Sequence, residues 1–127
     1  MSTPFKVKIP SVSISRLDYV GESFQITQWY PKPAVYDQNG WHQIPYLTQG
    51  EFYSEYGSFD VTITLPKNYV VGATGDLQTK TEIDFLDDLA ARTAQKFETN
   101  GFENGNTKLK STPFPKSDST YKTIRYT

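Results

Sequence analysis

The chain has 127 residues, of which 36% are hydrophobic, and its 13 basic and 14 acidic residues leave a net charge of −1. This length predicts a single domain spanning 1–127, and the balanced charge disfavours nucleic acid and anionic lipid as partners. The chain contains no cysteine, which excludes disulfide bonds and thiolate chemistry, and no apolar run long enough to predict a membrane span.

Alternating apolar and polar residues predict three short strands in the N-terminal part. The first two cover 5–9 and 12–14 and are separated by Pro10. The third covers 24–30, and one of its faces would carry Phe24, Ile26, Gln28 and Tyr30. We expect this strand to end at Pro31, because proline has no amide proton to offer a sheet ladder.

Residues 31–57 form a long segment with little periodicity and many aromatic rings, and its Asn39-Gly40 pair predicts a turn. Loops of this length are usually functional or disordered. Because rings favour burial, we expect an ordered loop that packs on another surface. The aromatic residues that could form an interface are Trp29, Tyr36, Trp41, Tyr46, Phe52 and Tyr53. Internal packing of the loop and a flat sugar-binding platform are the alternatives.

The second half of the chain begins with its clearest alternation, at 59–65, which predicts a strand with one face in the core. A turn at 66–68 would lead into a second apolar strand at 69–74, giving an antiparallel hairpin. Alternation at 121–126 predicts a final strand. Because the chain stops within that strand, we expect it to be an excised part of a larger N-terminal domain.

From Thr81 the apolar residues recur every three or four positions, which predicts one helix at 82–98 with Thr81 as its N-cap. The segment that follows, 101–119, is rich in Gly, Asn, Pro and Ser and predicts a loose linker. Together the elements predict a mainly β fold, with a curved, saddle-like antiparallel sheet or a sandwich and a single helix.

Few residues offer catalytic chemistry. His42 is the only histidine, which excludes a two-histidine zinc site and leaves a small hydrolase with one possible base. We interpret it as a loop histidine that bonds to the backbone. Acidic residues near the start of the helix interact favourably with its dipole. For the other acidic residues, the sequence alone cannot show whether two of them lie at the separation that a glycosidase pair requires. We therefore predict no catalytic residue, no metal ligand and no cofactor in this chain.

Four parts in a fixed order carry a resemblance to a known family. They are a Thr-Gln strand, a proline-bounded loop, a Phe-Asp-Val-x-Ile-x-Leu-Pro strand and a Val-Val-Gly-Ala-x-Gly strand, and they run from Phe24 to Gln78. In this order they resemble the N-terminal β domain of bacterial gluzincin zinc aminopeptidases, the family that includes aminopeptidase N and the leukotriene hydrolase. The helix and the linker are less diagnostic.

The resemblance implies a saddle-like sheet that packs on a thermolysin-like catalytic domain of the same polypeptide. In that family the His-Glu-x-x-His motif of the catalytic domain binds the zinc ion and supplies the catalytic Glu. This motif is absent from the present sequence. The chain would then be a non-catalytic part of a zinc-dependent, aminopeptidase-like metallopeptidase. An exported or cell-envelope parent is compatible with it.

The resemblance also implies a role for the end of the third strand. In the family a Gln-x-Glu or Gln-x-Gln segment faces the free amine of the peptide substrate. Gln28 matches its first position, and Tyr30 stands where the acid or amide is expected. A phenol accepts a hydrogen bond from an ammonium but lacks the charge that strengthens it, so an altered substrate preference would follow.

A second function remains open from the sequence. A stand-alone β-sandwich module could use the same aromatic rings to bind carbohydrate or protein. If the aromatic loop packs on a peptidase domain instead, the isolated chain would expose apolar area and could self-associate.

Overall fold

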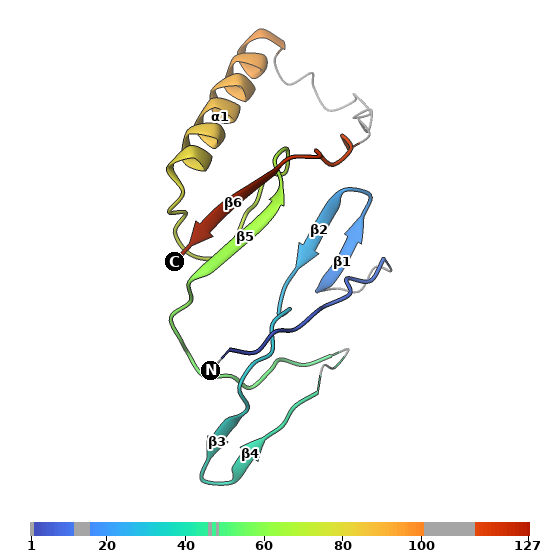
Figure 1. Cartoon of the computed structure of the whole chain (residues 1–127), viewed down its shortest axis with the longest axis vertical. Helices are drawn as coiled ribbons and strands as arrows, with labels where there is room; N and C mark the ends of the chain where they lie inside the picture. Colours follow the sequence, from blue (N-terminus) through green and yellow to red (C-terminus); the bar gives the residue numbers. More distant parts are fainter. Residues whose placement is uncertain (1, 12–15, 46, 48, 101–113) are drawn as a thin grey trace. The chain divides into compact units, whose positions relative to one another are not determined.

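The computed structural model describes residues 2–11, 16–45, 47, 49–100 and 114–127. It divides into two compact units, Met1–Gly57 and Ser58–Thr127, each of which is described by itself. The described residues form three two-stranded antiparallel sheets and one α-helix (Figure 1), which confirms the prediction of a mainly β chain with a single helix. A curved, saddle-like or sandwich arrangement stays a prediction.

The first unit contains a hairpin of β1 (Leu17–Val20) and β2 (Ser23–Ile26). Its register places Tyr19 opposite Phe24, and the two rings stack with centroids 5.4 Å apart and planes 22° apart. Gly21 has a φ of 58° at the first turn position, where a type II′ turn requires a positive φ. β1 is not predicted by the sequence pattern, because four residues are too few to show an alternation by themselves.

The strand predicted at 24–30 is wrong at its C-terminal end, because β2 stops at Ile26. The amide of Thr27 still donates to the Arg16 carbonyl at 3.1 Å, but Gln28 then turns the chain with a φ of 53°. Gln28 and Tyr30 therefore do not continue the strand face of Phe24. The strand ends where its partner β1 runs out, and Pro31 plays no part in that ending.

The segment predicted to be an aperiodic loop contains a second hairpin, of β3 (Val35–Asp37) and β4 (Gly40–His42). The Asn39-Gly40 turn is confirmed, with Gly40 at a φ of 99°. The Asp37 carboxylate accepts the Asn39 amide at 2.8 Å, which is the two-residue spacing of an Asx turn. Three-residue strands are too short to produce a readable period, so only the turn was visible in the sequence.

The strand predicted at 5–9 does not form, since these residues pair with no other strand in the part of the chain that the structure describes. Phe5 instead packs its ring on Trp29, with centroids 5.8 Å apart. Alternation alone does not make a strand, because the backbone also needs a partner for its hydrogen bonds. The strand predicted at 12–14 lies outside the described residues.

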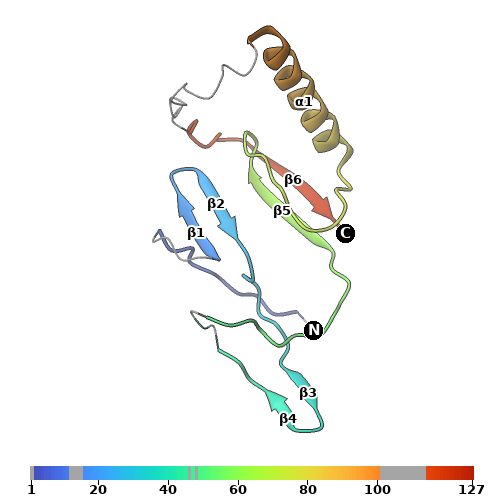
Figure 2. The ribbon, with the colours of Figure 1, turned by 180° about the vertical axis from the view of Figure 1, so that it is seen from behind.

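The second unit is built on β5 (Val61–Pro66), α1 (Lys80–Asn100) and β6 (Tyr121–Tyr126). β5 and β6 run antiparallel side by side, and α1 begins near the end of β6, as Figure 2 shows from behind. Residues 76–78 line the other edge of β6, where the Gln78 amide donates to the Arg125 carbonyl at 2.8 Å. Ile124 and Tyr126 of β6 are the buried apolar residues described in this unit.

The predicted hairpin of 59–65 with 69–74 is wrong. The turn itself forms, because the Tyr69 amide donates to the Pro66 carbonyl at 3.2 Å. The ladder cannot continue from it, since Pro66 has no amide proton to return to Tyr69. β5 pairs with β6 instead, and the final strand predicted at 121–126 is confirmed.

The helix predicted at 82–98 is confirmed as α1, but its N-cap is Thr79 and not Thr81. The Glu82 and Ile83 amides both donate to the Thr79 carbonyl, at 3.0 and 3.1 Å. The Thr79 hydroxyl accepts the Arg125 amide at 2.9 Å, so the start of the helix is tied to β6. No helix in the described residues is both long enough and apolar enough to cross a bilayer.

The linker predicted at 101–119 lies mostly outside the described residues, which resume at 114. Its last part is anchored by Asn68, whose amide group donates to the Lys116 carbonyl at 2.9 Å and accepts the Asp118 amide at 3.0 Å. The described end of the segment is therefore held to the turn after β5.

Candidate functional site

The hairpin of β3 and β4 presents two different faces, and the inner face carries a polar cluster. Asp37 and His42 lie on this face with Val35, which is 5% exposed. The Asp37 carboxylate lies 2.8 Å from His42 Nε2, and the Tyr53 hydroxyl donates to its other oxygen at 3.5 Å. The Tyr53 ring meets the His42 ring edge-on, with centroids 5.1 Å apart.

The prediction that His42 is a loop histidine bonded to backbone is wrong. His42 belongs to β4, opposite Val35, and its Nε2 faces a carboxylate. Nε2 is buried and lies beside the Asp37 carboxylate without the alignment of a hydrogen bond to any described residue. The four-residue turn brings the side chains of Asp37 and His42 to the same face of the hairpin. If a hairpin is assumed, the sequence Asp-Gln-Asn-Gly predicts this placement.

The electrostatics of the cluster favour an ionised Asp37. The His42 imidazole beside it and the Asn39 amide hold the pKa of the Asp37 carboxyl below its usual value. Two effects raise the pKa of the Tyr53 hydroxyl: the larger is partial burial, and the next is the negative charge of Asp37. The tyrosine therefore stays protonated and acts as a hydrogen-bond donor, which stabilises the hairpin rather than supplying a base.

The outer face of the hairpin carries two exposed aromatic rings. Tyr36 and Trp41 are cross-strand partners, and each is 67% exposed. Their centroids lie 4.9 Å apart and their planes are inclined by 60°. Two rings at this angle form a ridge rather than a flat platform.

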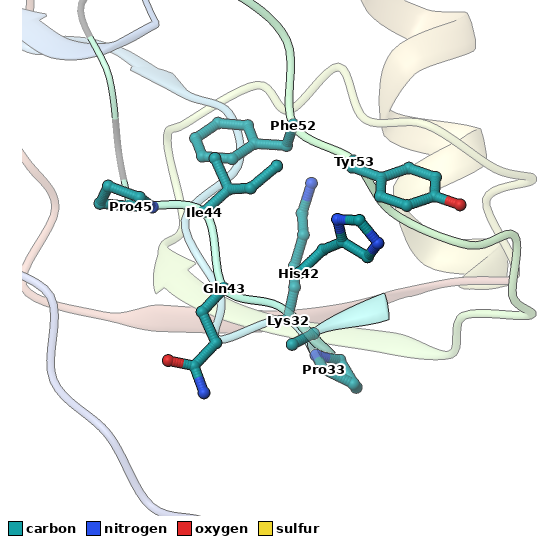
Figure 3. A pocket seen from close by; sticks show the side chains of 9 residues that line it. Lys32, Pro33, His42, Gln43, Ile44, Pro45, Phe52 and Tyr53 are labelled. Carbon is teal, nitrogen blue, oxygen red and sulfur yellow. The ribbon is translucent and has the colours of Figure 1, made fainter. Parts of the chain in front are cut away.

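A hollow of about 470 Å³ lies beside the inner face (Figure 3). Its lining residues come from the segment before β3, from the end of β4 and the residues after it, and from the segment around Phe52. They are Lys32, Pro33, Ala34, His42, Gln43, Ile44, Pro45, Phe52 and Tyr53. Most of this lining is apolar, and lysine is its one residue with a permanent charge.

Two aromatic rings hold the ammonium of Lys32. Its Nζ lies 5.2 Å from the centre of the Phe52 ring and 5.7 Å from that of Tyr30. Both distances are within the range of a cation–π contact. The side chain is half-buried, and no carboxylate pairs with it among the described residues.

The two predicted substrate residues, Gln28 and Tyr30, lie in different surroundings. Gln28 is half-buried, and its Oε1 finds no hydrogen-bond partner among the described residues. Tyr30 packs its ring edge-on against Trp29, with centroids 5.8 Å apart, and faces Lys32. The roles predicted for Gln28 and Tyr30 in binding a substrate stay predictions.

The six predicted interface residues fall into separate groups. Tyr36 and Trp41 form the outer ridge, Phe52 and Tyr53 line the hollow, and Trp29 packs between Phe5 and Tyr30. Tyr46 lies outside the described residues. Sequence reasoning missed Lys32 and Asp37, because a lone lysine between prolines and a turn aspartate carry no motif.

Among the described residues, no three His, Asp or Glu side chains are grouped so that they could hold a metal ion. No family model, no curated protein and no solved structure matches the chain. The resemblance to the aminopeptidase domain therefore stays a prediction from the residues alone.

Proposed function

We propose that the chain is a non-catalytic recognition module whose contact surface is the outer ridge, defined as Tyr36 and Trp41. The exposure of both rings carries this proposal, since each leaves two-thirds of its surface to solvent. Aromatic residues are enriched in the centres of protein interfaces, where they bury much area at little entropic cost.

The contacts on the inner face of the hairpin, behind the ridge, support the same function. The Asx turn at Asp37 and the contact with His42 brace the hairpin from its inner face, so the two rings are presented in a fixed arrangement. A preorganised surface loses less conformational entropy on binding than a flexible loop. The inclination of 60° between the rings favours a protein groove over the flat face of a sugar ring.

The partner that we propose is a thermolysin-like catalytic domain of the same polypeptide. This form of the proposal rests on the resemblance of residues 24–78 to the N-terminal domains of zinc aminopeptidases. In it the ridge packs against the catalytic domain, Gln28 and Tyr30 lie near the substrate amine, and zinc is bound only by the catalytic domain.

The first experiment reads the open reading frame beyond Thr127 and expresses the whole polypeptide. Trp29→Phe leaves Trp41 as the single tryptophan of these 127 residues, and any tryptophan elsewhere in the whole polypeptide is replaced by phenylalanine as well, so that quenching by acrylamide reports on the ridge alone. We expect strong quenching in the isolated chain and protection in the whole protein. Equal quenching in both, or a reading frame without His-Glu-x-x-His, would contradict the proposed partner.

The second experiment measures activity in the whole protein. Trp41→Ala should lower kcat/KM by about tenfold, because removing a central interface ring typically costs more than 1 kcal/mol. Tyr56→Ala is the matched control, since Tyr56 is a fully exposed ring of the same unit. Peptidase activity in the isolated chain would refute the non-catalytic assignment.

A further inference from the structure

The hollow beside the inner face contains a charge that no described carboxylate neutralises. Lys32 is half-buried between two rings and has no carboxylate partner among the described residues, although unpaired lysines usually extend into water. Figure 3 shows its ammonium in the same space as the side chains of Phe52, Ile44 and His42.

The acid nearest in the sequence is already engaged. Asp37 does not line the hollow, and its oxygens are occupied by the Asn39 amide, by His42 and by the Tyr53 hydroxyl. These contacts leave the positive charge of Lys32 available to an incoming anion. Because the lining carries a single full charge, it suits a monoanion better than a phosphate dianion.

The rest of the lining defines the other half of the ligand. Phe52, Ile44 and Pro45 offer an apolar wall, and a volume of about 470 Å³ is within the range of small-molecule sites. We propose that the hollow binds a carboxylate attached to an apolar group, with the carboxylate on Lys32 and the apolar group against Phe52. Such a ligand is either a free acid or the C-terminal carboxylate of a peptide with an apolar last residue.

This site is independent of the proposed docking of the outer ridge. Tyr36 and Trp41 do not line the hollow, so a failure of one proposal leaves the other unaffected.

The test is a titration of the isotopically labelled chain with phenylacetate and, in parallel, with the neutral phenylacetamide. Amide signals of residues 42–44 and 52–53 should shift with the acid, with a dissociation constant on the order of 1 mM for so small a ligand. The amide should bind about tenfold more weakly, because it lacks the charge. Equal shifts from both compounds would overturn the proposal.

Variants identify the cation. Lys32→Met keeps the length of the stem and should weaken phenylacetate binding about tenfold, whereas Lys32→Arg keeps the charge and should retain most of it. Lys8→Met, at an exposed lysine of the same unit, is the matched control and should bind as the unaltered chain does. A loss with Lys8→Met, or an equal loss with Lys32→Arg and Lys32→Met, would refute the assignment to Lys32.

An acetylated peptide ending in phenylalanine separates the two sources of the carboxylate. If it binds about tenfold more tightly than phenylacetate, and its C-terminal amide does not, the ligand is a peptide terminus. If the peptide acid is no better than phenylacetate, the ligand is a free acid.

Discussion

Asp37 makes contacts with three different residues in and beside the β3–β4 hairpin. It closes the turn through the Asn39 amide and contacts His42 across the strands, and the same side chain receives the Tyr53 hydroxyl. An isolated two-stranded hairpin is marginally stable, so contacts of this kind decide whether the ridge of Tyr36 and Trp41 is presented at all.

This dependence predicts a loss of the hairpin in acid. The pKa of Asp37 is lowered in the folded chain, so its contribution is fully present above the pKa of the unfolded residue. The contribution is lost in a window below the ordinary pKa of an aspartate, as the pH falls through the lower, folded value. We expect the ring-current-shifted proton signals of Tyr36 and Trp41 to disappear over this window.

Asp37→Asn is the control, because asparagine can still accept the turn hydrogen bond but has no carboxyl to titrate. Its hairpin signals should be weaker at neutral pH and independent of pH below about 4. If the hairpin signals of Asp37→Asn decrease with falling pH as those of the unaltered chain do, a group other than Asp37 controls the loss of the hairpin.

At the scale of the elements, one buried ion pair joins α1 to β6. Lys122 Nζ lies 2.7 Å from Glu82 Oε1, and their side chains are only 14% and 5% exposed. The same ammonium lies 4.6 Å from the centre of the Phe85 ring, on the next turn of the helix. Helix and strand are therefore fixed together near the N-terminus of the helix.

Removing one partner of this pair should be costly. Glu82→Gln leaves the Lys122 charge without its counter-ion, and we expect the free energy of unfolding to fall by about 3 kcal/mol. The combined Glu82→Leu and Lys122→Met variant should lose less than the single change, because it leaves no unpaired charge. Urea denaturation followed by circular dichroism measures both.

Asp84→Asn is the matched control on the same helix. Asp84 pairs with Lys80 at the surface, where both side chains are more than half exposed, and such pairs contribute little. A loss as large as that of Glu82→Gln would mean that helix charge in general, and not the buried pair, stabilises the unit.

At the scale of the whole molecule, the described residues form only a small buried core. Among the described residues the buried apolar side chains are Val35 in the first unit and Ile124 and Tyr126 in the second. Each unit instead depends on its own local hydrogen bonds and ion pairs. We therefore expect low stability, because burial of apolar surface is the main force that offsets conformational entropy.

Two units with separate cores should give two unfolding transitions. Both tryptophans lie in the first unit, and the only described helix lies in the second. Tryptophan emission and far-ultraviolet circular dichroism should therefore report different urea midpoints, and Glu82→Gln should move only the second. Coincident midpoints that shift together in this variant would show a single cooperative unit.

The sequence by itself determined the features that depend on near neighbours. The period of the residues after Thr79 is long enough to specify α1, the alternation in β5 and β6 specifies strands, and Asp37 to Gly40 specifies a turn. The aromatic residues of the candidate interface were also visible, although not their grouping.

Only the tertiary structure decided which strands pair and which side chains meet. Pairing of β5 with β6 joins residues about sixty positions apart, and no local pattern encodes that choice. The Lys32 site and the Glu82–Lys122 pair arise in the same way, from segments that come together only in the folded chain. The physical reason is that a backbone hydrogen-bonding group or a charged side chain can pair with any suitable partner that the fold brings close to it. The periodicity of a segment indicates only which of its faces is apolar.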